Sequence, residues 1–384
     1  MSLGNFRMQA KTFFGFETVL AEELKSLGAA DVVVKNRLVE FQGDLGFMYK
    51  ANYSLSTALR IIKPIFSFSV KNEHQLYERF KRFNWEEFLD LNQTFIIDST
   101  VHSDYFTHSH YAALKVKDAL VDHFQEKYGK RPSVDKYNPD IYFNLHISHD
   151  KVTLSLDSSG ESLHKRGYKT EHGKAPINEV LAAGLLKIAG WDGKGNFLDP
   201  MCGSGTILTE AALIAANIPP QIHREKFAFE NWKDFDSELF EIIKETRLNR
   251  IVEFEGKIMG YDTNPTMLRI AEKNIENADL EDFIEVKYQD FFKSEKDLFP
   301  VLIVFNPPYN ERIESDNEVL YKSIGDTLKN NYPNTFAWFI TSDLSAKKFV
   351  GLRPSKKVKV FNGKLECDFL RYDIYEGSKK ASKS

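Results

Sequence analysis

From residue 176 to the end of the chain, short apolar segments alternate with amphipathic ones, and this rhythm constrains the fold more than any other feature of the sequence. The short segments are rich in Val, Ile, Leu, Phe and Tyr and lie at 196–198, 257–261, 285–288, 301–305 and 336–340. Helical spacing of apolar residues is found in the segments that precede or separate them, at 176–188, 209–216, 265–278 and 319–328. Strands that alternate with helices pair in parallel, so the pattern predicts a doubly wound α/β sheet.

The last two strand-like segments predict a different connection. Asn362-Gly363 joins 356–361 to 365–372, and an Asn-Gly pair in this position is a strong signal for a two-residue β-hairpin. A parallel sheet that is closed by an antiparallel hairpin resembles the Rossmann-like layout of class I methyltransferases. Residues 217–256 interrupt the alternation and are expected to form a largely helical insertion.

The first 175 residues follow no such alternation. Helical spacing predicts helices at 15–27 and 112–128, each followed by a glycine that can end it. Strands are expected at 31–37, 38–42, 141–148 and 151–157. This half is therefore predicted to be an α+β region. A chain of 384 residues also exceeds the usual size of one hydrophobic core, so two or three domains are expected.

A glycine-containing loop follows the strand at 196–198 and opens a helix, with the sequence Asp199-Pro200-Met201-Cys202-Gly203-Ser204-Gly205-Thr206. Glycine lets the backbone approach a ligand closely, and the first N–H groups of a helix are free to bind it. The loop has neither the Gly-Lys-Ser/Thr of a Walker loop nor the third glycine of the dinucleotide fingerprint. Alone, it is equally compatible with an ordinary tight turn. Within the strand series it predicts cofactor contacts, from Asp199, Pro200, Gly203, Gly205 and Thr206.

Two further acids end the next two predicted strands. Asp262 follows Tyr261 and is placed to accept hydrogen bonds from both ribose hydroxyls of a nucleoside cofactor. Its alternative reading is the N-cap of the helix that begins at Asn264-Pro265, although Asn264 fits that role better. Asp290 follows the third strand and is a candidate reader of the adenine amine, although a surface acid would look the same. With Asp199, the three acids stand at successive carboxyl ends of strands, where doubly wound sheets bind their ligands.

The fourth strand runs into Asn306-Pro307-Pro308-Tyr309. The side-chain oxygen of Asn306 and the carbonyl of Pro307 form a stiff pair of acceptors, which suits the two hydrogens of an –NH₂ group. Tyr309 can stack on the flat face of a base. An isolated Asn-Pro-Pro would be a turn, but at this strand it predicts a catalytic site for an exocyclic base amine. The motif leaves guanine N2, adenine N6 and cytosine N4 open, whereas attack at cytosine C5 would need a cysteine where Tyr309 stands.

These motifs resemble those of the THUMP-domain ribosomal RNA guanine-N2 methyltransferases, and the likeness covers nearly the whole chain. The matching stretches are 199–206 and 306–309 in the catalytic half, 108–122, 131–135 and 156–168 upstream, the helix start at 175–179 and the aromatic stretch at 227–232. Asn310 replaces the glycine that usually follows the tyrosine in this family.

The resemblance implies a domain order and a reaction. It implies a ferredoxin-like region over 1–55, a THUMP domain over 45–157, a linker over 158–175 and the methyltransferase domain over 176–384. It implies S-adenosylmethionine as cofactor, with Pro176, Asn178 and Asn306 beside it, and guanine N2 of 23S ribosomal RNA, naked or early in assembly, as target. An adenine-N6 methyltransferase acting on DNA or RNA, or a non-catalytic RNA-binding assembly factor, is the alternative.

Charge limits where RNA can bind. The chain carries 51 Lys and Arg against 55 Asp and Glu, so contacts to RNA must come from local patches. The THUMP resemblance suggests phosphate contacts from five residues, each equally compatible with a solvated surface: His108, Lys115, Arg131, Lys165 and Arg166. A fragment that begins near Lys169 is expected to bind the cofactor but to lose most RNA affinity.

Other function classes are disfavoured. The chain has two cysteines and irregularly spaced histidines, so no metal site is expected. We also expect no membrane span, because no apolar run approaches the roughly 20 residues it needs. The first residues lack the apolar core of a secretory signal, which predicts a cytoplasmic protein.

Overall fold

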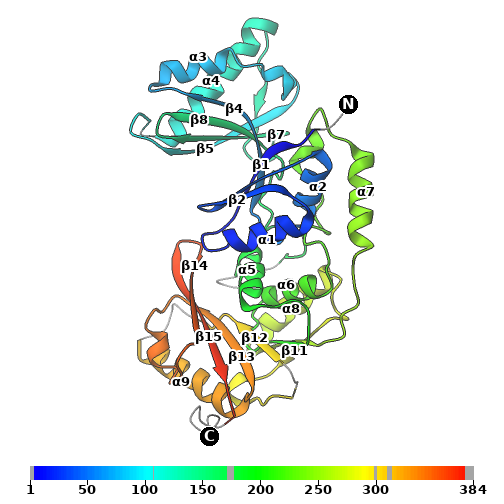
Figure 1. The fold of residues 1–384 in the computed structure, drawn as a ribbon, viewed down its shortest axis with the longest axis vertical. Helices are drawn as coiled ribbons and strands as arrows, with labels where there is room; N and C mark the ends of the chain where they lie inside the picture. Colours follow the sequence, from blue (N-terminus) through cyan, green and yellow to red (C-terminus); the bar gives the residue numbers. More distant parts are fainter. Residues whose placement is uncertain (1–3, 107, 171–176, 298–300, 309–313, 377–384) are drawn as a thin grey trace.

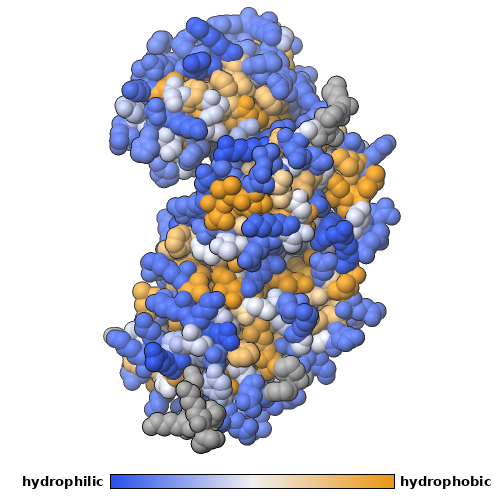
Figure 2. Space-filling view, in the orientation of Figure 1, coloured by the Kyte–Doolittle hydropathy of each residue, from blue (hydrophilic) through white to orange (hydrophobic). Residues whose placement is uncertain are grey.

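The computed structural model describes residues 4–106, 108–170, 177–297, 301–308 and 314–376. In these residues the chain forms one eight-stranded and one seven-stranded sheet, which lie at different levels of an elongated molecule (Figure 1). Figure 2 shows a notch in the surface between the lobe that contains α3 and α4 and the rest of the molecule.

The N-terminal sheet has the strand order β2-β3-β1-β4-β8-β7-β5-β6. Its strands are β1 (Phe6–Lys11), β2 (Ala30–Lys35), β3 (Leu38–Gly43), β4 (Arg60–Ser69), β5 (Thr94–His102), β6 (Ser133–Val134), β7 (Ile141–Ser148) and β8 (Lys151–Asp157). Its helices are α1 (Glu17–Leu27), α2 (Leu45–Ser54), α3 (Glu73–Lys81), α4 (Ser109–Tyr128) and the 3₁₀ turn η1 (Trp85–Glu87). The glycines expected to end α1 and α4 do so, because Gly28 and Gly129 adopt φ values of +100° and +69°.

Strand β4 joins the two parts of this sheet. Its first three residues pair with β1, and the strand from Ile62 to Ser69 pairs with β8. The register with β8 shifts between Pro64 and Phe66. Such a shift breaks the period-two pattern by which a strand is recognised, and β4 was not anticipated from the sequence. The same is true of β1, β5, α2 and α3. A single hydrophobic core extends from Met8 to Leu156 across both parts.

The second sheet has the order β11-β10-β9-β12-β13-β15-β14, with β15 antiparallel to β13 and β14 and the other pairs parallel. This confirms the predicted doubly wound sheet with an antiparallel hairpin. Its strands are β9 (Asn196–Asp199), β10 (Ile258–Asp262), β11 (Ile284–Tyr288), β12 (Val301–Phe305), β13 (Thr335–Thr341), β14 (Lys356–Asn362) and β15 (Leu365–Ile374). The accompanying helices are α5 (Glu179–Ala189), α6 (Thr206–Ala215), α8 (Pro265–Asn277) and α9 (Glu314–Asn331), with the 3₁₀ turns η3 (Phe291–Lys293) and η4 (Ala346–Lys348).

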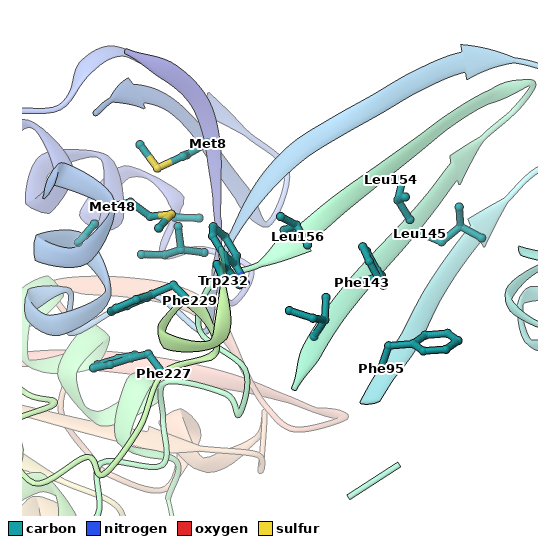
Figure 3. Close-up of a cluster of buried hydrophobic side chains, with 14 of the residues drawn as sticks. Met8, Met48, Phe95, Phe143, Leu145, Leu154, Leu156, Phe227, Phe229 and Trp232 are labelled. Carbon is teal, nitrogen blue, oxygen red and sulfur yellow. The ribbon is translucent and has the colours of Figure 1, made fainter. Parts of the chain in front are cut away.

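The insertion at 217–256 differs from its prediction. Only η2 (Ala228–Asn231) and α7 (Ser237–Leu248) are helical, and the remainder is irregular. Its aromatic residues complete the N-terminal core: Phe229 stacks on Tyr49 of α2 with ring centroids 4.5 Å apart, and Trp232 belongs to the same cluster (Figure 3). Helix α7 lies beside α2 (Figure 1). The expectation of a largely helical insertion was wrong because burial against the other half, and not helix formation, orders these residues.

Candidate functional site

Parallel pairing brings the predicted cofactor and catalytic residues to one edge of the second sheet. Asp199 of β9 pairs with Gly260 of β10, two residues before Asp262. On the other side, β12 pairs with β9 and delivers Asn306 directly after its last residue. Asp199, Asp262 and Asn306 therefore gather at the carboxyl edge, as their positions in the sequence predicted. Asp290 lies farther along this edge, after the outermost strand β11.

The glycine loop is shaped by residues with positive φ. Gly203 and Gly205 have φ values of +54° and +80°, which residues with a side chain rarely adopt. A Cβ on Gly205 would lie 3.2 Å from the Cβ of Ala271 in α8, a tight contact that would require the loop or the helix to shift by a few tenths of an ångström. Pro200 and Thr206 are buried at the two ends of the loop. The loop thus presents backbone N–H groups of the first turn of α6 at the edge.

Asp262 connects this loop to the next strand. Its Oδ2 accepts a hydrogen bond from the Gly203 N–H at 2.9 Å, and its Oδ1 accepts one from the Asn264 N–H at 2.8 Å. Asn264 in turn caps α8, so the alternative reading of Asp262 as the cap of that helix is wrong. A carboxylate has about four lone-pair sites, so Asp262 retains acceptors for the two hydroxyls of a ribose.

Asp199 is a buried acid. Its side chain accepts one hydrogen bond, from the Met201 N–H at 3.1 Å, and is 1% exposed. Burial raises the pKa of its carboxyl well above the ordinary value, and the neighbouring charge of Asp262 acts in the same direction. The hydrogen bond from the Met201 N–H opposes this shift, and a nearby positive charge would stabilise the carboxylate further. The edge is thus suited to a ligand that carries a positive group.

Asp290 and Asn178 both have local structural roles. Asp290 caps η3 by accepting a hydrogen bond from the Phe292 N–H at 3.0 Å, a role that the sequence did not predict. Asn178 caps α5, which begins at Glu179 and not at residue 176. Neither role prevents a contact to a cofactor. Pro176 lies outside the described residues.

Asn306 carries a buried acceptor that lacks a partner. Within the residues that the structure describes, its Oδ1 is inaccessible to solvent and makes no hydrogen bond. A buried polar atom without a partner is uncommon in a folded protein and points to a ligand that would supply one. Pro307 is buried beside it. Tyr309 and Asn310 lie outside the described residues.

The prediction that Arg166 contacts RNA was wrong. It was expected to contact RNA phosphates, yet it is 1% exposed and pairs with Glu210 of α6, with Nε 3.2 Å from Oε1. Its other nitrogens donate to the carbonyl oxygens of Leu163 at 2.7 Å and Ser56 at 2.6 Å. Arg166 thus joins the N-terminal region, the linker and the catalytic domain, and it is not available to RNA.

Two further residues hold the site and were not predicted. Asn274 of α8 is fully buried, donates to the Ser204 carbonyl in the glycine loop at 3.0 Å and accepts from the Thr170 N–H at 3.3 Å. Lys169 lies 3.2 Å from Glu179 and donates to the Ile177 carbonyl at 3.1 Å. A signal for Asn274 existed, since it occupies an apolar position of an amphipathic helix; Glu210 likewise interrupts an apolar helix.

The other four candidates for RNA contacts lie at or near the surface. His108, Arg131 and Lys165 are exposed and Lys115 is half-buried. Arg131 and Lys165 already face acids, with Arg131 3.4 Å from Asp122 and Lys165 2.6 Å from Glu161. Their contact to RNA stays a prediction.

The structure also bears on metal binding and on membrane insertion. In the described parts of the chain, no three His, Cys, Asp or Glu side chains are grouped so that they could hold a metal ion. Nor does any described helix combine the length and the hydrophobicity that crossing a membrane requires.

Three family models match the chain. Residues 166–371 match an RMKL-like methyltransferase domain, residues 70–157 a THUMP domain and residues 7–62 an RlmL ferredoxin-like domain. The chain is 38% identical to the ribosomal RNA large subunit methyltransferase K/L of Syntrophotalea carbinolica over 94% of its own length and 53% of that protein. It therefore spans about half the length of the K/L enzymes that it matches. It is 35% identical to a protein named as a candidate RNA methyltransferase in Synechocystis, over 94% of the chain and 95% of that protein.

Solved structures resemble the chain over almost its full length. One is a candidate methyltransferase in complex with SAH, with a TM-score of 0.86 and 28% identity over 97% of this chain and 99% of that one. Another is described as a predicted N6-adenine-specific DNA methylase from Listeria monocytogenes, with a TM-score of 0.86 and 30% identity over 98% of this chain and 97% of that one.

Proposed function

This chain belongs to the family of RMKL-like methyltransferases that carry a THUMP domain, and from this premise we propose that it transfers a methyl group from S-adenosylmethionine to an exocyclic amine of a base in RNA. One observation carries the proposal. The buried Oδ1 of Asn306 has no partner among the described residues and stands at the carboxyl edge, beside the acids that suit a nucleoside cofactor.

The residues at the edge fit this cofactor. Asp262 has acceptors left for the ribose hydroxyls, and the glycine loop offers N–H groups. The buried carboxyl of Asp199 suits the positive charge that the cofactor carries. When bound, the cofactor supplies an activated methyl group on a positively charged sulfur. A related structure was solved with SAH, the product of methyl transfer, which supports the assignment.

The catalytic residues would act mainly by positioning. Asn306 Oδ1 accepts one hydrogen of the base amine and the Pro307 carbonyl accepts the other, which directs the nitrogen lone pair out of the plane of the base. Alignment of this kind can lower a barrier by about 7–11 kcal/mol. The alkylated nitrogen becomes acidic and releases its proton to water, so the site needs no strong general base. A paired target base must first leave its helix, at a cost of a few kcal/mol.

The proposed target is guanine N2 of large-subunit ribosomal RNA, met as naked RNA or early in assembly, which would place the enzyme in the cytoplasm. The K/L relatives are named for the large-subunit RNA, which supports this choice. Adenine N6 is the second candidate, because a similar structure is described as a predicted N6-adenine methylase.

Nucleoside mass spectrometry separates these targets. Large-subunit RNA from a strain that lacks the protein is incubated with the enzyme and labelled S-adenosylmethionine, then digested to nucleosides. Label in N2-methylguanosine supports the proposal. Label in N6-methyladenosine would change the proposed target base to adenine but would leave the proposed mechanism unchanged. Cofactor binding without label in any RNA or DNA would instead favour a non-catalytic RNA-binding factor.

A further inference from the structure

A basic segment, residues 345–364, stands out in an otherwise acidic chain. It contains seven Lys and Arg and no Asp or Glu, whereas the whole chain has a formal net charge of −4. It comprises η4, the connection to β14, strand β14 itself and the turn of the final hairpin. So dense a run of one sign creates a local potential that the net charge of the protein conceals.

Strand register places this basic segment beside the candidate catalytic site. Phe305 of β12 pairs with Phe339 of β13, so Asn306 lies level with the last residues of β13. Strand β13 ends at Thr341, and the basic segment begins four residues later. The segment therefore leaves the sheet at the same carboxyl edge, one strand away from Asn306.

The second part of the segment returns to this edge. Thr341 pairs with Asp368 of β15, which pairs with Lys359 of β14. The residues after Lys359, including the turn at Asn362-Gly363, therefore extend beyond the end of β13. Both ends of the basic segment flank the edge, and Figure 1 shows β14 reaching toward the region of α1 and β2.

Tertiary contacts hold the segment in place. A Cβ on Gly325 of α9 would lie 1.7 Å from the Val350 carbonyl oxygen, so the segment packs directly on the helix backbone. At the hairpin, the ring centroids of Phe361 and Phe14 lie 5.7 Å apart. The Arg37 guanidinium lies 5.9 Å from the centroid of the Phe361 ring. The first part of the basic segment is thus held against α9, and its hairpin end is held against the N-terminal region.

Most of these charges are not neutralised. Lys357 and Lys359 face acids of β15. The five other cations are exposed and form no ion pair with any residue that the structure describes: Lys347, Lys348, Arg353, Lys356 and Lys364. The cofactor half of the edge, in contrast, carries Asp199, Asp262 and Asp290. Beyond β13, Asp343 is the acid that precedes the basic segment, and the five exposed cations outnumber it. The edge is therefore acidic on the cofactor side and mainly basic beyond β13.

We propose that the basic segment binds the phosphates next to the target nucleotide, so that the catalytic domain itself holds the RNA backbone beside Asn306. The inference rests on the proposed function for its RNA substrate, and it adds a second RNA surface to the THUMP region. Lysine and arginine contacts to phosphate position a nucleic acid without reading its sequence. Each such contact releases counterions, which makes binding sensitive to salt.

The test uses the full chain with three substitutions, Lys347→Ala, Lys348→Ala and Lys364→Ala. These lysines are exposed and unpaired among the described residues, so their loss leaves no buried acid behind. The matched control is Lys322→Ala with Lys329→Ala, two exposed lysines of α9. Filter binding to unmodified large-subunit ribosomal RNA is measured across a salt series, with S-adenosylmethionine affinity by calorimetry and methylation kinetics alongside.

Loss of three phosphate contacts lowers the salt slope by about 2 to 3, since each contributes roughly 0.7–0.9. Wild type should therefore lose about 20- to 40-fold more RNA affinity than the triple variant between 50 and 200 mM salt. KM for RNA should rise while kcat and cofactor affinity are kept. An unchanged slope and KM, or an equal loss in the control, overturns the inference even if wild type methylates the RNA. The triple variant could also show a reduced salt slope while the wild type methylates no RNA. That result would support RNA binding by the basic segment and would reject the proposed function.

Discussion

Replacement of Arg166 by Ala tests how strongly the buried ion pair with Glu210 connects the two halves of the chain. Both side chains have 0% exposure, and the guanidinium also donates to the carbonyl oxygens of Ser56 and Leu163. Removing one partner of a buried pair leaves the other charge uncompensated, which typically costs about 3–5 kcal/mol. We expect the free energy of unfolding of Arg166→Ala to fall by that amount near neutral pH.

The cost should depend on pH. Burial raises the pKa of Glu210 above its ordinary value of 4.5, and the charge of Arg166 opposes this shift. Without Arg166 the folded-state pKa rises further, so the folded state binds a proton that the unfolded state has already released. Stability of the variant then falls as pH rises from the ordinary pKa to the folded one. Arg166→Ala should therefore be destabilised less at about pH 5 than at about pH 8.

Urea unfolding at both pH values measures this effect. Trp191, whose Nε1 donates to the Ala211 carbonyl of α6 at 2.9 Å, reports on the helix that carries Glu210. Arg166→Met combined with Glu210→Leu is the control, because replacing both partners by apolar residues is often neutral. A cost below about 1 kcal/mol at both pH values, or a double variant as unstable as Arg166→Ala, would refute the reasoning.

The remaining predictions concern the candidate site. Asp262→Ala should weaken S-adenosylmethionine binding by about 1.5–3 kcal/mol, because it removes acceptors for the ribose and the bond to the Gly203 N–H; unchanged affinity by calorimetry in the folded variant would reject the assignment. Asn306→Ala should keep cofactor binding and abolish methylation of labelled RNA, and normal turnover would remove Asn306 from the mechanism. Gly205→Ala should lower the melting temperature more than Gly190→Ala, since both have positive φ but only at Gly205 would the Cβ make a tight contact; equal losses would show that backbone strain alone matters.

The ion pair also changes the expectation for a shortened chain. From the sequence alone, a fragment beginning near Lys169 was expected to fold and bind the cofactor. Such a fragment lacks Arg166 and leaves Glu210 unpaired inside α6, next to the glycine loop. It also exposes apolar surface of the insertion, where Phe229 and Phe240 belong to the N-terminal core. The structure therefore argues against an independent catalytic fragment.

The local pattern of the sequence determined the catalytic sheet and much of its edge. The strands that carry or precede Asp199, Asp262 and Asn306 are short, contain buried apolar residues and end in or run into a polar residue, so the order of elements already implied where these residues would meet. The hairpin at Asn362-Gly363 followed from turn chemistry. These features depend on residues close to one another in the chain, which is why a single sequence was enough.

Only the tertiary structure decided which distant segments meet. Arg166 was expected at the surface because the THUMP resemblance suggested a phosphate contact, and the local sequence gives no sign of its partner Glu210, which lies 44 residues away. The aromatic insertion gave no sign that it would pack on α2 of the other half. The position of the basic segment beside Asn306 follows from strand register, which the sequence does not reveal. Hydrophobic periodicity indicates that a side chain is buried, but the hydrophobic effect is non-directional. The pattern therefore does not indicate which distant segment the side chain packs against.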